Sequence, residues 1–136
     1  MIKCMDTKNT VISIRKFDET SINDAKNFVD RLFKNIINNK STPESLNYFQ
    51  ADTYKFYFLI LFMKEYFDGN EISQEYAISL VPKKFASRIK RLQVLKNAVK
   101  LKYINEKSSQ VDKRRKIYKP TEKLINDFLI LTKLLT

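Results

Sequence analysis

The chain lacks histidine altogether and has only one cysteine and one glycine in 136 residues. Without histidine there is no imidazole to serve as a catalytic base, a pH switch near neutrality or a metal ligand. The single cysteine, Cys4, excludes an intrachain disulfide and a cysteine-based zinc site, and it fits the reducing cytoplasm. The single glycine, Gly69, excludes the glycine-rich loops that bind nucleotide phosphates. We therefore expect a cytoplasmic protein that is not an enzyme and holds no metal or cofactor.

A long hydrophobic run is also missing. The most apolar stretch, residues 56–63, is much shorter than the roughly 17–25 residues that a membrane span requires. The N-terminal residues 1–6 lack the apolar segment of a signal peptide. We therefore expect no membrane partner and interpret residues 56–63 as part of a buried helix in a single domain.

Acidic residues are scarce in one part of the chain. The net charge is +11, and 14 of the 26 Lys and Arg residues lie in residues 83–119, where only Glu106 and Asp112 oppose them. This segment therefore carries +12, and the rest of the chain sums to −1. A basic run is often only a solvated face, but charge confined to one segment favours a surface that binds a polyanion.

Hydrophobic spacing and capping residues predict a mainly helical fold. Residues 1–20 show no clear pattern and are expected to form an N-terminal arm, partly disordered or one strand. Residues 21–136 are expected to form one domain, in which Ser21, Ser73 and Thr121 cap helices. The predicted helices cover residues 21–39, 53–67, 83–100 and 121–136, with short helices after Pro43 and Ser73, and Gly69 in a left-handed helix end.

The predicted helix at residues 83–100 has an apolar and a basic face. Five apolar residues at helical spacing are predicted to face the core: Phe85, Ile89, Leu92, Leu95 and Val99. Six residues are left pointing outward: Lys83, Lys84, Ser87, Arg88, Lys90 and Arg91. Strands at residues 103–106 and 115–118, joined by a polar turn, are predicted to form a basic hairpin after this helix.

The order of these elements is that of a winged helix-turn-helix. A core helix, a short helix, a turn, a basic helix and a basic hairpin follow one another over residues 54–121, and the wing of two or three strands covers residues 103–118. In such a fold the basic helix enters the major groove of DNA, and the hairpin contacts the neighbouring groove or backbone. The sequence therefore predicts a DNA-binding core.

Residues 54–121 resemble the MarR/SarA type of winged-helix transcription regulator. The wing of that family reads D-x-R, followed by a strand and a threonine that opens a helix, and Asp112, Arg114 and Thr121 match this pattern. The segment at residues 87–89, Ser-Arg-Ile, is similar to the family's Ser-Arg-Leu. The chain differs from the family in having no glycine in the helix-turn-helix turn or before the wing.

The resemblance implies roles for the residues of the wing. Arg114 would enter the minor groove at the wing tip, and Asp112 would pair with an arginine to shape the wing. Lys113 and Arg115 would contact phosphates on either side. The candidate DNA-binding residues are Lys83, Lys84, Ser87, Arg88, Lys90, Arg91, Lys107, Ser109, Lys113, Arg114 and Arg115.

The resemblance also implies a homodimer formed by the N- and C-terminal helices, here residues 21–39 and 121–136. Apolar stripes at residues 22–37 and 124–135 favour the same expectation, because a monomer would expose them. A two-fold dimer places two recognition helices about one DNA turn apart. Members of the family often bind small effectors, but nothing in this sequence indicates one.

We predict a sequence-specific transcriptional regulator, bacterial or from a phage, that binds double-stranded DNA. Two alternatives stay open. The first is a winged-helix protein that binds RNA, or that binds nucleic acid without site preference as architectural proteins do. The second is a protein-interaction module whose basic face docks an acidic partner. The salt dependence of duplex binding, and competition between specific and random duplexes, distinguish them.

Overall fold

The computed structural model describes residues 17–37 and 42–135 and divides the chain into two compact units. Of the described residues, 17–37 and 133–135 belong to the first unit, and 42–132 belong to the second. The N-terminal arm predicted at residues 1–20 lies outside the described residues except for its last four, where a helix has already begun at Glu19.

The first unit is built on one long helix. Helix α2 covers Glu19–Leu32 and continues as a π-helix, η1, over Phe33–Ile37. Its N-cap is Asp18 and not the predicted Ser21, because the Asp18 carboxylate accepts a hydrogen bond from the Ser21 backbone N–H at 3.3 Å. No residue of α2 is buried. Apolar residues line a hollow on one side of the helix: Ile22, Ala25, Val29 and Phe33.

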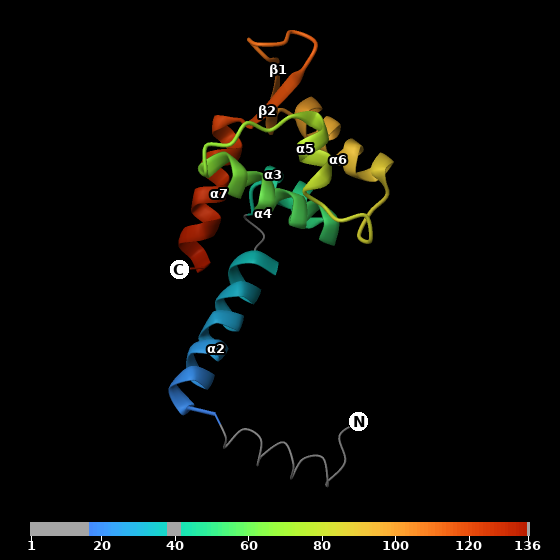
Figure 1. Cartoon of the computed structure of the whole chain (residues 1–136). Helices are drawn as coiled ribbons and strands as arrows, with labels where there is room; N and C mark the ends of the chain where they lie inside the picture. The colour runs from blue at the N-terminus through green and yellow to red at the C-terminus, as the bar shows by residue number, and fades with distance from the viewer. Residues whose placement is uncertain (1–16, 38–41, 136) are drawn as a thin grey trace. The chain divides into compact units, whose positions relative to one another are not determined.

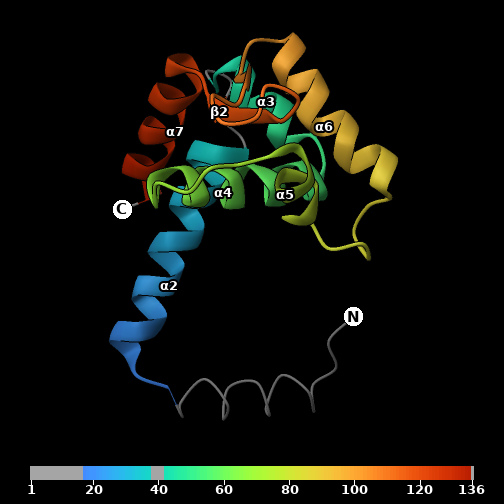
Figure 2. The ribbon, with the colours of Figure 1, turned by 45° about the horizontal axis from the view of Figure 1, so that its top comes forward.

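The second unit is a group of packed helices from one end of which a two-stranded hairpin projects (Figures 1 and 2). Its helices are α3 (Glu44–Gln50), α4 (Thr53–Phe67), α5 (Gln74–Ser79), α6 (Arg88–Lys100) and most of α7 (Glu122–Leu135). Strands β1 (Ile104–Ser108) and β2 (Lys116–Pro120) pair antiparallel, with Ile104 opposite Pro120 and Ser108 opposite Lys116. In both views α6 and α7 lie on opposite sides of α4. The described part is therefore mainly helical with a small sheet, as predicted.

Helix α4 forms the centre of the core, as its apolar run predicted. Four of its residues are at most 1% exposed: Phe58, Leu59, Phe62 and Met63. The ring of Phe49 in α3 stacks on that of Phe58, with centroids 6.3 Å apart. Leu95 of α6 and Tyr118 of β2 are also buried. One core therefore fixes the positions of the basic helix and the hairpin.

Local signals predicted several helix ends correctly. Ser73 and Thr121 each accept a hydrogen bond from the backbone N–H three residues later, at 3.2 and 3.3 Å, at the starts of α5 and α7. Gly69 ends α4 with a φ of +81°. After α6, Lys102 takes a left-handed φ of +66°. That conformation strains a residue with a Cβ atom, so this position suits a glycine better than a lysine.

The basic helix starts later than predicted. Helix α6 begins at Arg88 and not at residue 83, because Ser87 is its N-cap and accepts a hydrogen bond from the Lys90 N–H at 3.2 Å. Lys83 and Lys84 lie in a separate turn before it, although both are exposed as predicted.

The buried face of α6 also differs from the predicted one. The residues that face inward are Arg91, Val94, Leu95 and Ala98. Two of the residues predicted to face inward are exposed, Ile89 to 69% and Phe85 to 44%. Leu95 is buried as predicted, but the stripe was counted from Phe85, which precedes the helix, and this shifted its phase.

The hairpin lies where it was predicted, with each strand starting one residue later and ending two residues later. A further segment joins its edge, because Ser73 forms an isolated antiparallel bridge with Ile117. The Tyr118 N–H also donates to the Ile72 carbonyl at 2.8 Å. The residues just before α5 are thereby attached to β2, which orients α5 and α6 against the hairpin.

Candidate nucleic-acid interface

Arg91 holds the turn between α5 and α6 in place. Its side chain is 8% exposed, and Nη1 donates hydrogen bonds to the carbonyl oxygens of Ile78 at 3.0 Å and Val81 at 3.2 Å. These carbonyls lie at the C-terminal end of α5 and just beyond it, where a helix leaves acceptors unpaired and favours a positive charge. The prediction that Arg91 points outward as a DNA contact is therefore wrong, because the guanidinium already serves the fold.

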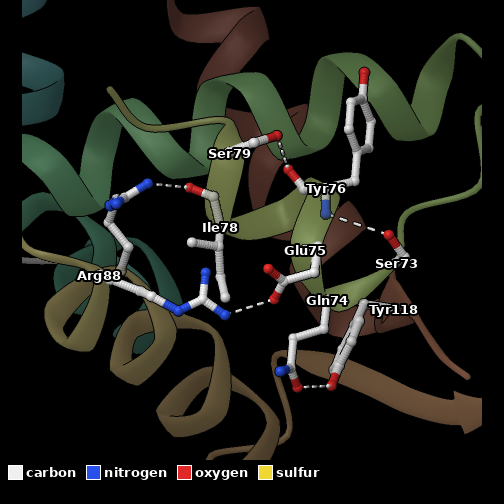
Figure 3. A network of polar contacts seen from close by, with 9 residues as sticks. Ser73, Gln74, Glu75, Tyr76, Ile78, Ser79, Arg88 and Tyr118 are labelled. Carbon is white, nitrogen blue, oxygen red and sulfur yellow. Dashed lines mark hydrogen bonds and ion pairs between the residues drawn. The ribbon is translucent and has the colours of Figure 1, made fainter. Parts of the chain in front are cut away.

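Arg88 faces outward as predicted, but it is engaged by an acidic residue of the neighbouring helix. Its Nη2 lies 2.7 Å from Oε2 of Glu75 in α5, and Figure 3 shows the two side chains meeting between the helices. The hydrogen bond from Arg88 lowers the pKa of the Glu75 carboxyl below its usual range. Both side chains are more than half exposed, so water and salt weaken the pair and an anion can compete for Arg88.

The hairpin tip is shaped by Asp112 and Ser109. Asp112 Oδ1 accepts a hydrogen bond from the Arg114 backbone N–H at 3.0 Å and lies 3.5 Å from its Nε. Asp112 thus pairs with an arginine of the hairpin. Ser109 was predicted to contact DNA, but it is 5% exposed, and its Oγ accepts hydrogen bonds from the backbone N–H groups of Val111 and Asp112. Its position is that of a turn-shaping residue.

The two arginines of the hairpin differ in how far their side chains are exposed to solvent. The Arg114 side chain is 93% exposed despite its contact with Asp112, so it is available to a ligand. Arg115 Nη2 lies 3.7 Å from Glu71 Oε1, at the long end of an ion pair. Lys107 and Lys113, the other predicted contacts of the hairpin, are both exposed.

A polar cluster that sequence reasoning missed fixes the base of the hairpin. Glu106 Oε2 accepts hydrogen bonds from Lys96 Nζ at 2.7 Å and from the Tyr118 hydroxyl at 2.6 Å. That hydroxyl also lies 3.2 Å from Gln74 Oε1, and Figure 3 shows the Tyr118 and Gln74 side chains meeting. The hydrogen bonds from Lys96 and then Tyr118 lower the pKa of the Glu106 carboxyl. Burial alone would lower the pKa of Lys96, but its bonds to Glu106 and Tyr118 raise it. The cluster joins α5, α6 and both strands.

In residues 83–119, the basic side chains without a salt-bridge or buried partner are lysines. Every arginine of residues 83–119 is engaged, three in salt bridges and one with backbone carbonyls. Among the lysines of this segment, Lys96 pairs with Glu106. Within the described part of the chain the other nine lysines are exposed and have no acidic partner at salt-bridge distance: Lys83, Lys84, Lys90, Lys100, Lys102, Lys107, Lys113, Lys116 and Lys119.

The side of α6 that faces solvent carries residues that sequence reasoning did not select. Ile89, Gln93 and Lys100 are exposed and lie at spacings of four and seven, opposite the buried face. We call Ile89, Gln93 and Lys100 the α6 ridge. Counting from the Ser87 cap, a strong helix-start signal, would have identified Gln93 in place of Arg91.

In the described ranges, no cluster of three or more His, Cys, Asp or Glu residues could hold a metal ion. The helices of residues 17–37 and 42–135 also include none that is long and apolar enough to cross a membrane.

Comparisons with models of known protein families, with curated proteins and with solved structures found no match to this chain. The resemblance to MarR/SarA regulators therefore rests on the sequence motifs alone.

Proposed function

We propose that this chain is a winged-helix protein that binds double-stranded DNA. The observation that carries the proposal is the set of nine unpaired lysines, which lie on α6, in the turns before and after it and on the hairpin. Each phosphate of DNA carries a charge, and exposed ammonium groups bind such charges without exact placement. A positive surface on this arrangement of helix and hairpin matches what a duplex presents.

The order of elements supports the winged-helix assignment. Helices α4, α5 and α6 are followed by a two-stranded hairpin, and the residue before α5 bridges β2. In this fold α6 is the recognition helix and enters the major groove. The hairpin is the wing, and it brings Arg114, Lys107 and Lys113 to the flanking backbone or minor groove. Asp112 keeps its role as the residue that shapes the wing.

We further propose that the protein acts as a homodimer and regulates transcription in a bacterium or a phage, as the MarR/SarA resemblance implies. The exposed apolar residues of α2 and η1 support self-association, since Val29 is 61% and Phe33 51% exposed. A second copy that covered them would give the two-fold symmetry of a palindromic DNA site.

A second candidate function, duplex binding without site preference, is favoured by the engagement of the arginines. Arginine reads guanine through two hydrogen bonds, whereas lysine acts toward phosphate as a point charge. With Arg88 paired to Glu75 and Arg91 buried, α6 offers less guanine readout than its sequence suggests.

Two experiments test the proposal. Binding to a labelled duplex is measured for wild type, Lys90→Gln and Lys123→Gln, where Lys123 is an exposed lysine of α7 outside the basic segment. Lys90→Gln should weaken binding to every duplex and reduce the salt slope by about one, and Lys123→Gln should change neither. Equal effects of the two substitutions would contradict the proposed surface.

Competition with random duplex then separates the two candidates. A regulator should prefer duplexes selected for binding over random duplex by a factor of at least about 10³. If random duplex competed as well as the selected duplexes, the protein would be a duplex binder without site preference. Absence of salt-dependent duplex binding would instead favour the protein-interaction module.

A further inference from the structure

The α6 ridge presents an apolar side chain where the surrounding surface is basic. Ile89, the second residue of α6, is 69% exposed. It lies beside Arg88 and Lys90, and Gln93 is exposed one helical turn further on. Exposing a β-branched apolar side chain gains nothing for the fold, and the ordinary apolar sites of the core are filled by other residues of α6.

We propose that Ile89 and Gln93 make α6 selective for A·T base pairs, with Ile89 contacting the C5-methyl group of thymine and Gln93 bonding adenine. This inference rests on the proposed binding of duplex DNA. The thymine methyl is the one apolar group that base pairs present in the major groove, and glutamine forms two hydrogen bonds with adenine N6 and N7. The two side chains therefore match the two halves of one kind of base pair.

The spacing of the two residues allows both contacts at once. Residues four apart on an α-helix are separated by about 6 Å along the axis, and successive base pairs are about 3.4 Å apart. Ile89 and Gln93 would thus address bases within about two steps of each other. Neither arginine of α6 occupies the face that carries Ile89 and Gln93, because Arg91 is buried and Arg88 is directed to Glu75. Bonds from arginine to guanine therefore do not compete with the two proposed contacts.

The test uses duplexes that differ by single chemical groups. Wild type is titrated with a short alternating A·T duplex, with the same duplex in which deoxyuridine replaces thymidine, and with one in which 7-deazaadenine replaces adenine. Loss of each contacted methyl should weaken binding about fourfold. Loss of adenine N7 should weaken it by about tenfold.

Substitutions assign these effects to residues. Ile89→Ala should abolish the difference between thymidine and deoxyuridine duplexes but keep the effect of 7-deazaadenine, and Gln93→Ala should do the reverse. Ile60→Ala, which truncates an exposed isoleucine of α4, should leave both differences unchanged. Lys90→Gln should weaken binding to all duplexes by the same factor, since phosphates are common to them.

The outcomes distinguish this inference from the proposed function. If wild type binds all three duplexes equally well and with a normal salt dependence, the A·T readout is wrong and duplex binding stands. A thymidine preference that persists in Ile89→Ala also overturns the assignment, because DNA shape would then explain it. If no duplex is bound, the proposed function fails and the inference fails with it.

Discussion

Replacing Arg91 with alanine should destabilise the protein without changing the electrostatics of DNA binding. The side chain is 8% exposed and donates to three carbonyls, at 3.0, 3.2 and 3.4 Å. Hydrogen bonds from charged donors contribute about 1.5–3 kcal/mol each, and buried carbonyls left without a partner add a penalty. Water reaching the vacated site offsets part of this loss. We therefore expect the free energy of unfolding to fall by about 3 kcal/mol.

Two further variants separate the contributions of the Arg91 side chain. Arg91→Met keeps an apolar stem of similar length and removes the donors, so its loss of stability measures the hydrogen bonds. Arg91→Lys keeps the charge but has no counterpart to Nε, which donates to the Ser87 carbonyl at 3.4 Å, so we expect an intermediate loss.

The assay combines urea unfolding with duplex titration at several salt concentrations. Lys90→Ala is the matched control, because Lys90 is an exposed neighbour of Arg91 without an acidic partner among the described residues. We expect it to change stability by less than about 0.5 kcal/mol and to reduce the salt slope by about one. If Arg91→Ala behaved like Lys90→Ala, with native stability and a reduced slope, Arg91 would be a phosphate contact and its structural role would be refuted.

Three other substitutions have defined expected results. Glu75→Gln should free Arg88 and remove a charge that repels phosphate, which should tighten duplex binding about two- to tenfold at low salt; an unchanged affinity would show that Glu75 does not compete with DNA. Lys102→Gly should raise the free energy of unfolding by about 1 kcal/mol in urea titrations, because φ is +66° there, whereas Lys102→Ala should not. Glu106 has a pKa below its usual value near 4.5 through its bond from Lys96, so its contribution to stability should be complete above about pH 5 and lost as the pH falls through the lowered pKa. Glu106→Gln should flatten the stability profile in that acidic range, and an unchanged profile would contradict the role of the cluster.

The features of the fold that were predicted correctly depend on local chemistry. The apolar run of α4 indicates a buried helix wherever it lies in the chain, and hydroxyl caps such as Ser73 and Thr121 act on backbone groups three residues away. The left-handed φ of Gly69 is likewise a property of one residue. Such signals need no knowledge of the tertiary structure.

The candidate site was predicted less well, because its side chains choose partners that are distant in the sequence. Arg88 meets Glu75 thirteen residues earlier, and Arg91 reaches Ile78 over the same separation. Arginine is usually exposed, and the misplaced apolar stripe left Arg91 on the outward face of the predicted helix. Gln93, which was missed, carries no charge, so a search for basic residues passes over it. Its outward position follows from the helix phase, which depends on the start of α6 at Arg88.

The central claim is that the basic segment binds the phosphates of duplex DNA, and it is tested most directly by the salt dependence of binding. The association constant of wild type for a mixed-sequence duplex is measured between about 50 and 200 mM salt, where log K falls with log salt by about 0.9 for each phosphate contact. With nine unpaired lysines available, the account predicts a slope steeper than about −4. A slope near zero, or no duplex binding at about 50 mM salt, would contradict it.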